Sequence, residues 1–260
     1  MILRFFTFAM LCIGIQLSAV PAFAMTNQEA ALKLEAMTWY AEDYPPFNYP
    51  DADGVPTGMA VEILMAAFAK IGAEIPAATF KIVPWTESYK TLQKNPGTAL
   101  FSMTYTPERQ RVMKFVGPSI PIRVSVIVRK TDKIKITTEA DLAALKIGAV
   151  RDDIGDQLIR KLALSDDVIA RKNTLKDLFY FFSHNRVNAV AYSPEVFFHY
   201  LKSTGGDPSL YEEAYVLKEG QVGYAFNMST SADVLATLQR AIDELRVDGT
   251  IDRIISSYTK

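Results

Sequence analysis

The chain has 260 residues, of which 49% are hydrophobic and 22% are charged, with 28 basic and 29 acidic side chains. This near-neutral balance, without basic runs, lacks the electrostatic footprint of a protein that binds nucleic acid. The apolar content predicts a substantial core, and the length suffices for two lobes. One cysteine and two histidines are too few for a disulfide or for a histidine- and thiolate-rich metal site, so we expect no cofactor.

Residues 1–24 have the pattern of a secretory signal peptide. Arg4 supplies a positive charge, an apolar run extends from Phe5 to Ile15, and the segment ends in Ala22-Phe23-Ala24, which is typical of a cleavage site. The apolar run is too short to span a membrane. We therefore expect cleavage after Ala24 and export to the periplasm. Cys12 lies in this segment, so the exported chain would contain no thiol.

Beyond this segment, strand-like runs alternate with amphipathic helices, which predicts an α/β fold. The first of these helices is expected from about Thr57 to Ile71, with Gly72 as its stop signal. Its apolar residues fall on one stripe: Val61, Leu64, Met65, Phe68 and Ile71. Such a stripe is typical of a helix that packs on a core.

Residues 101–118, FSMTYTPERQRVMKFVGP, set an arginine where a strand is expected to give way to a helix. Thr106 suits the N-cap and Pro107 the first helical position, so Arg109 falls in the first turn. Backbone N–H groups without intrahelical partners and the helix dipole favour an anion there.

Two hydroxyls precede this helix. Ser102 and Thr104 are two apart on the expected strand, so both can face the side on which the helix begins. Arg109 would add a two-pronged, permanently charged donor. The pattern predicts a carboxylate-binding site, although a capped surface helix with a solvated arginine would have the same local sequence.

The remainder of the chain predicts successive βα units and a helical C-terminus. Strands are expected at 147–150, 168–170 and 187–192, and helices at 155–164 and at 175–184 after a Thr174 cap. A later helix has Val234, Leu238, Ala241 and Leu245 on one stripe and stops at Gly249, and a final helix capped by Thr250 presents Ile251, Ile254, Ile255 and Tyr258.

A set of motifs then resembles a known family. In order they are Tyr44-Pro-Pro-Phe47, Gly54 to Gly58, Trp85, Thr106-Pro-Glu-Arg109, Phe115-Val-Gly-Pro118, Gly223-Tyr-Ala-Phe226 and Leu245 to Ile251. The chain resembles the periplasmic solute-binding proteins of the polar amino-acid ABC-transporter type, which are family 3 of the extracellular solute-binding proteins. The resemblance implies a type II periplasmic-binding-protein fold: two α/β lobes joined by two crossing segments, with a ligand cleft between them.

The resemblance also implies a division of the chain. We expect a linker at 25–36, a discontinuous lobe 1 at 37–120 and 219–260, and lobe 2 at 121–218. The expected partner of such a monomer is an inner-membrane ABC permease.

By the same resemblance, Tyr44 and Trp85 would be the two aromatic walls of the cleft, and Ser102, Thr104 and Arg109 would bind the carboxylate of the ligand. Aromatic walls exclude water and so strengthen a charged contact. The alternatives are structural: Tyr44 would pack over the turn prolines, and Trp85 would be a core residue at a strand edge.

The second lobe departs from the family pattern. Family members usually show Gly-Ser/Thr-Thr after the strand at 147–150, where this chain has Arg151-Asp152-Asp153. The aspartate that usually pairs with the ligand ammonium is replaced by Ser193. Asp153 is the candidate for a replacement charge, although an acid at a helix N-terminus is also an ordinary cap.

Two further acids, Glu42 and Asp43, precede the tyrosine turn. They would reach a cationic ligand tail if they faced the cleft, and a solvated acidic turn is the alternative.

The expected function is capture, without chemical change, of a small carboxylate-bearing solute, such as an amino acid or derivative, for an ABC importer. One alternative is a periplasmic dehydratase or lyase on the same scaffold, for which Glu42, Asp153 or Glu195 would have to act as a general acid. Another is a ligand-sensing partner of a membrane receptor.

Overall fold

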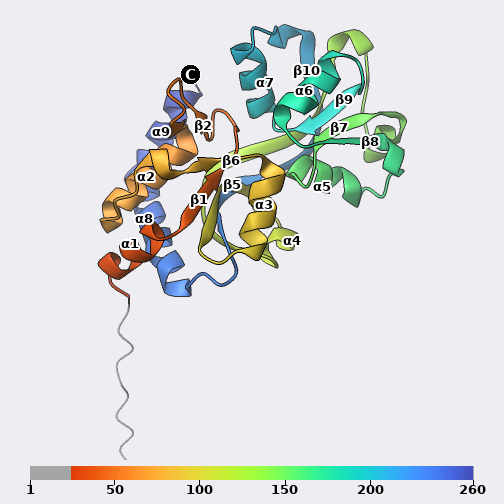
Figure 1. Ribbon diagram of the computed structural model, residues 1–260. Coiled ribbons are helices and arrows are strands. Elements are labelled where there is room, and N and C mark those ends of the chain that lie inside the picture. Colours follow the sequence, from red (N-terminus) through yellow and green to blue (C-terminus); the bar gives the residue numbers. More distant parts are fainter. Residues whose placement is uncertain (1–24, 260) are drawn as a thin grey trace, which may run out of the picture.

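The computed structural model describes residues 25–259 (Figure 1), so the expected signal peptide lies outside the described residues. The strands are β1 (Thr38–Ala41), β2 (Tyr49–Pro50), β3 (Pro56–Thr57), β4 (Lys81–Ile82), β5 (Thr98–Thr104), β6 (Lys114–Arg129), β7 (Ile147–Val150), β8 (Ile169–Lys172), β9 (Ala189–Tyr192) and β10 (Tyr211–Phe226). The helices are α1 (Asn27–Glu35), α2 (Met59–Ile71), α3 (Trp85–Lys94), α4 (Pro107–Gln110), α5 (Ile154–Lys161), α6 (Leu175–Ser183), α7 (Pro194–Ser203), α8 (Ala232–Val247) and α9 (Thr250–Tyr258).

The main sheet has the strand order β4-β1-β5-β10-β6-β9-β7-β8. Pairing is parallel among β4, β1 and β5 at one end and among β9, β7 and β8 at the other. The long strands β6 and β10 lie between these ends and pair antiparallel with each other. Two parallel α/β halves are thus joined through a central antiparallel ribbon.

The middle of this ribbon joins the two halves. β5 pairs with β10 at Val222–Phe226, and β9 pairs with β6 at Ser125–Val128. Between these contacts Pro121, Ile122 and Arg123 of β6 are paired with Gln221, Gly220 and Glu219 of β10. The two crossing segments implied by the family resemblance are therefore present.

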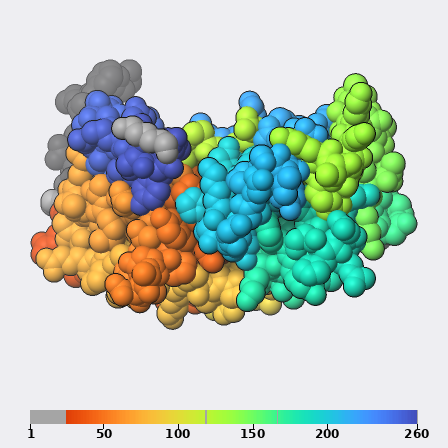
Figure 2. Space-filling model, turned by 90° about the horizontal axis from the view of Figure 1, so that it is seen from above, coloured from red at the N-terminus to blue at the C-terminus, as the bar shows by residue number. Residues whose placement is uncertain are grey.

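We call the parts on either side of this ribbon lobe 1 and lobe 2. The boundaries expected from the sequence, 37–120 with 219–260 and 121–218, fall in the ribbon and stay a prediction. Figure 2 shows the two lobes meeting along a seam, where Tyr49 of lobe 1 lies 5.9 Å from His199 of lobe 2, measured between ring centroids.

The core of lobe 1 is built around Trp39 on β1. Its ring makes edge contacts with Phe68, Phe101 and Phe226 at centroid distances of 5.3, 5.9 and 5.5 Å. Its buried indole N–H donates to Leu34 O at 3.1 Å, so the polar atom is satisfied. Helices α1, α2, α8 and α9 lie on one side of the lobe-1 strands and α3 on the other (Figure 1).

Most expected elements are present, with shifted boundaries. The α2 stripe is confirmed, with Met65 partly buried and its other members buried, and the α8 stripe is buried throughout. Thr57 belongs to β3, however, so α2 begins at Met59, and Val168 lies in a 3₁₀ turn before β8.

Two expectations near the termini were wrong. Residues 25–36, expected as a linker, contain helix α1, which has a capping box at Thr26 and packs against α2 and α8. The N-cap of α9 is Gly249 in the left-handed conformation, with φ 75°, and Thr250 is the first helical residue. Glycine accepts that conformation without the steric cost of a side chain.

Candidate functional site

Arg109 is held in place by a short, capped turn. The Thr106 hydroxyl accepts the backbone N–H of Arg109 at 3.1 Å, and Pro107 opens α4, as predicted. The helix is only four residues long, so the helix dipole and free N–H groups give the predicted anion site little support, and that site stays a prediction. A single turn has little macrodipole, and the N–H of Arg109 is already bonded. Any anion recognition here rests on the guanidinium.

That guanidinium is buried, with 1% of the residue exposed. Its Nη1 donates to Thr104 O at 3.3 Å, and its Cζ lies 5.2 and 5.6 Å from the ring centroids of Trp85 and Tyr89. Nε and Nη2 have no hydrogen-bond partner in residues 25–259. Two strong donors are therefore available, in a site where unmet donors are costly.

Asp153 reaches this arginine from lobe 2. Its Oδ1 lies 3.9 Å from Arg109 Nη2, and Asp153 is 6% exposed. Asp153 occupies the N-cap position of α5, but its side chain makes no cap hydrogen bond. Asp153 thus lacks the side-chain bond of an ordinary cap, although it keeps the N-cap position, and its Oδ2 has no hydrogen-bond partner among the described residues. The preceding Asp152 points elsewhere and pairs with Arg160 at 3.5 Å.

Ser102 lies at a bulge in β5. Its φ is 51°. Between the pairs Met103–Gly223 and Leu100–Ala225, β5 advances by three residues while β10 advances by two, so β5 contains one extra residue. The bulge interrupts the alternation on which the expected alignment with Thr104 depended. The Ser102 hydroxyl instead donates to the side-chain oxygen of Asn48. Thr104 is buried, and its backbone carbonyl accepts a hydrogen bond from Arg109.

The Asn48 contact ties β5 to the tyrosine turn. Asn48 Nδ2 donates to Glu42 O at 2.8 Å, and Tyr44 N donates to Asn48 O at 2.7 Å. Gly58, with φ 114°, allows the turn to approach closely, because a Cβ there would lie 2.5 Å from Phe47 O. The Tyr44 ring is 3% exposed and makes an edge contact with Tyr192 of lobe 2 at 5.7 Å. Tyr44 therefore contributes to the contact between the lobes.

Trp85 begins helix α3 rather than lying at a strand edge, but it is 3% exposed and packs in the main core, so the core part of that alternative is confirmed. Its ring stacks on Tyr89 at a centroid distance of 5.2 Å, and its indole N–H has no hydrogen-bond partner in the described chain. It lines a pocket and also contacts Arg109. Trp85 therefore contacts both the pocket and the buried Arg109.

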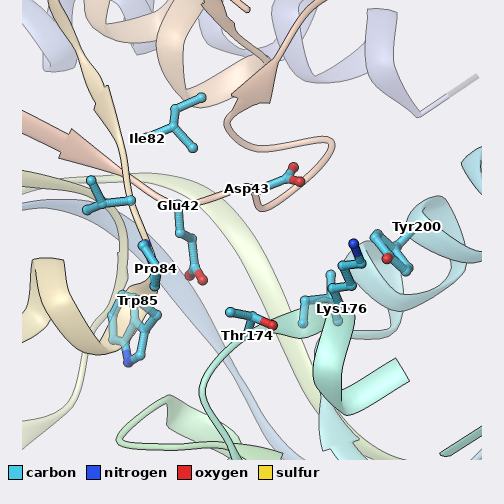
Figure 3. A pocket seen from close by; sticks show the side chains of 10 residues that line it. Glu42, Asp43, Ile82, Pro84, Trp85, Thr174, Lys176 and Tyr200 are labelled. Carbon is cyan, nitrogen blue, oxygen red and sulfur yellow. The ribbon is translucent and has the colours of Figure 1, made fainter. Parts of the chain in front are cut away.

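That pocket has a volume of about 320 Å³ and lies between the lobes (Figure 3). Lobe 1 contributes Glu42, Asp43, Ile82, Val83, Pro84 and Trp85, and lobe 2 contributes Thr174, Leu175, Lys176 and Tyr200. Figure 3 shows the Glu42 carboxylate extending toward the space between Trp85 and Thr174. Glu42 is half-buried at this pocket, whereas Asp43 is exposed, so the solvated-turn alternative holds for Asp43 and not for Glu42.

The charges around the pocket perturb one another. Burial, and then the charges of Asp153 and Asp43, raise the pKa of Glu42 well above its ordinary value, while Arg109 opposes the shift. Burial also raises the pKa of Asp153, again against the effect of Arg109. Desolvation penalises the ionised form of a carboxyl group, and like charges add to that penalty. Burial is thus the main reason that both carboxyl groups favour the protonated form.

Ser193 makes local contacts. It is the buried N-cap of α7, where its hydroxyl accepts from Val196 N at 3.5 Å and donates to Glu195 Oε2 at 2.8 Å. The preceding Tyr192 has a buried hydroxyl without a hydrogen-bond partner among the described residues. Sequence reasoning missed Tyr192 and Lys176, because neither has a motif of its own and only the folded chain brings them to the seam.

Residues 25–259 contain neither a candidate metal centre nor a candidate membrane-spanning helix. No group of three or more histidine, cysteine, aspartate and glutamate side chains there could hold a metal ion. No helix in the same range is long and apolar enough to cross a membrane.

The sequence matches a family model over most of its length. Residues 38–260 match the model of the bacterial extracellular solute-binding proteins, family 3. The chain belongs to this family. The predicted resemblance is confirmed, as is the expectation of a solute-binding protein rather than an enzyme.

Individual relatives are distant but extend over most of the chain. The probable amino-acid-binding protein YxeM of Bacillus subtilis (strain 168) is 28% identical over 229 residues, which are 82% of this chain and 79% of YxeM. A substrate-binding protein of an ABC uptake transporter from Streptococcus pneumoniae, solved with bound histidine, has a TM-score of 0.77 at 15% identity and covers 89% of this chain and 95% of its own.

The same fold also occurs in a sensor domain. A histidine kinase sensor domain matches with a TM-score of 0.75 at 18% identity, covering 86% of this chain and 96% of that domain. These structures confirm the two-lobed α/β fold class and nothing finer.

Proposed function

We propose that the chain is a periplasmic binding protein that captures a small carboxylate-bearing solute, an amino acid or a derivative, and delivers it to an inner-membrane ABC permease. The lobes close over the solute, and Arg109 binds its carboxylate. Family membership supports capture, and the names of YxeM and the histidine-bound protein support an amino acid.

The observation that carries this proposal is the buried guanidinium of Arg109. It lies at the seam between the lobes, against Trp85, with two donor atoms unmet in the described chain. A carboxylate matches the planar fork of a guanidinium, and a site screened from water strengthens that contact. Tyr44 and Trp85 supply aromatic surface. Ser102 fixes Asn48 through its hydroxyl, and the carbonyl of Thr104 accepts from Arg109, so both residues support the position of the arginine. In the proposed complex the solute carboxylate replaces Asp153 as the anion on Arg109.

A thermal-shift screen tests this site. The purified protein would be heated with L-amino acids, the matching α-hydroxy acids, and amines without an acidic group. A ligand at a hundredfold excess over its Kd should stabilise the fold by about 2.7 kcal/mol. We expect shifts from carboxylates only, and their loss in Arg109→Gln.

Arg111→Gln is the matched control, because Arg111 is two residues further along and exposed. It should keep the shifts. A ligand without an anionic group, or one that Arg109→Gln binds as tightly as the native protein, would contradict the proposal.

A further inference from the structure

A buried aspartate of lobe 2 holds the turn that carries Asp153. Asp156 lies in the first turn of α5, is 0% exposed, and does not line the pocket between the lobes. Its Oδ1 accepts from Arg171 Nε of β8 at 2.8 Å, and its Oδ2 accepts the backbone N–H of Asp152 at 2.9 Å. Both carboxylate oxygens are therefore bonded within lobe 2.

Further contacts from α5 fix Asp152. Gln157 Nε2 donates to Asp152 O at 2.6 Å. Arg160 Nη2 lies 3.5 Å from a carboxylate oxygen of Asp152 and 3.5 Å from one of Asp156. The N–H, the carbonyl and the carboxylate of Asp152 are thus all engaged by side chains of one helix.

The turn has a backbone conformation that needs such support. Asp152 has a φ of 61°, in the left-handed region that a residue other than glycine enters at a steric cost. Such a conformation persists only where the surrounding contacts fix it. It decides where the next residue points: Asp153 Oδ1 lies 3.9 Å from Arg109 Nη2 of lobe 1.

Stability alone is a poor explanation for the Asp156–Arg171 ion pair. The Asp156 side chain is 1% exposed and that of Arg171 is 22% exposed. The desolvation of two charges often exceeds their attraction, so a well-packed apolar pair would serve a fold at least as well. A buried pair can instead select one arrangement of the chain, and the arrangement that this pair contacts is the turn at 151–153.

We propose that Asp156, supported by Arg171, is a positioning residue for the contact between the lobes. It keeps Asp153 in front of Arg109 and thereby favours the closed arrangement of the lobes in protein without solute. The proposal goes beyond the proposed function, because it needs the Arg109–Asp153 contact and no solute takes part in it.

The step from the turn to the lobes is electrostatic. Arg109 is 1% exposed, and among the described residues Asp153 is the only acid within 4.0 Å of its guanidinium. A buried cation that loses its counter-charge is strongly disfavoured. Lobe opening would let water reach Arg109, so release of the turn should shift the lobes toward the open arrangement.

Distances between spin labels measure this shift in solute-free protein. Labels would be attached to cysteines at Lys94, the last residue of α3 in lobe 1, and at Ser165, beyond α5 in lobe 2, in a Cys12→Ser background. Both positions are exposed. Pulsed EPR gives the distribution of distances between the lobes. In Asp156→Asn, whose amide presents N–H groups to one of the two donors, we expect the opening constant to rise about fivefold or more.

A double-variant cycle tests the route through Asp153. Asp153→Asn removes the charge but keeps a good N-cap, and it should open the lobes to a similar degree. Addition of Asp156→Asn should then cause little further opening, because the charge that Asp156 positions is already absent. Asp141→Asn is the matched control: this exposed acid of lobe 2 likewise accepts the N–H groups of the preceding turn, from Thr137 and Thr138 at 2.8 Å. It should leave the distances as in the native protein.

Native distances in Asp156→Asn would overturn the proposal. Additive opening in the double variant would do the same, because Asp156 would then act on the lobes by another route. If Asp156→Asn does not fold, Arg171→Lys weakens the same turn more mildly and is subject to the same two outcomes. Failure of Arg109 to bind carboxylates in the thermal-shift screen would leave these distances unaffected, so this proposal and the proposed function fail separately.

Discussion

Two ion pairs join the lobes side by side, and they differ in burial. Glu108 and Arg109 are consecutive in α4, and both meet the α5 segment of lobe 2. Arg109 faces Asp153 at 3.9 Å with side chains 1% and 8% exposed, whereas Glu108 contacts Lys161 at 2.9 Å with side chains 50% and 49% exposed.

In the function that we propose, the longer pair is the one that the solute enters. Water screens the Glu108–Lys161 pair, and an exposed pair adds little to stability even at close range. The Arg109–Asp153 pair is desolvated without good hydrogen-bond geometry, an arrangement whose cost often exceeds its Coulomb gain. A stability argument does not explain such a pair, whereas a ligand that enters it does.

The largest expected effect comes from removing the buried cation. Arg109→Met leaves Asp153 buried and uncompensated, and we expect a loss of about 3 kcal/mol in the free energy of unfolding at pH 7. The pKa of Asp153, already raised by burial, would rise further without Arg109. For an acid with a raised folded pKa, stability is fully present below its unfolded pKa and is lost as pH rises through the folded pKa. Urea unfolding should therefore show a smaller loss at pH 5 than at pH 7.

The double variant Arg109→Met, Asp153→Leu separates the two causes. It should recover much of the loss, because neither charge stays buried. If the single and double variants unfold at the same urea concentration, Arg109 stabilises the fold through Trp85 and Tyr89 rather than through Asp153.

The lobe-1 side of the site was largely predictable from sequence. Thr106 and Pro107 act within a few residues of Arg109, so a cap rule suffices to place the arginine. The α2 and α8 stripes likewise follow from helical periodicity. The Ser102 alignment failed because a β-bulge depends on the register with β10, which the strand alone does not encode.

The lobe-2 side was not predictable in the same way. Asp153 at a helix start satisfies the rule for an ordinary cap, and its contact with Arg109 depends on how two lobes separated in sequence come together. Glu42 belongs to an acidic turn, and the local sequence predicts that such a turn is exposed to solvent. Asn48, which donates to Glu42 O and accepts from Ser102, fixes that turn against β5.

A smaller effect concerns Glu42, whose pKa is raised well above its ordinary value of 4.5 by burial and by the charges of Asp153 and Asp43. The stability tied to its protonated form should be present below pH 4.5 and lost as pH rises through the folded pKa. Glu42→Gln should therefore gain stability relative to the native protein with rising pH. The gain is about 1.4 kcal/mol for each pH unit by which the folded pKa exceeds the unfolded one.

Chemical unfolding from pH 4 to pH 8 measures this difference, and Glu87→Gln, an exposed glutamate of α3, is the matched control. Parallel stability curves for Glu42→Gln and the native protein would mean that Glu42 is solvated in both states.

The smallest effect is expected at the exposed pair. A hydrogen bond from Lys161 lowers the pKa of Glu108 to about 2, so any stability from this pair is present above the unfolded pKa and is lost as pH falls through about 2. Because water screens the pair, Glu108→Gln and Lys161→Gln should each leave ligand affinity within about twofold at physiological salt. Calorimetric titrations at low and high salt would measure this, with any difference confined to low salt. A large, salt-independent loss of affinity in either variant would mean that the exposed pair takes part in ligand binding, as we propose for Arg109 and Asp153. Burial would then not explain the difference between the two ion pairs.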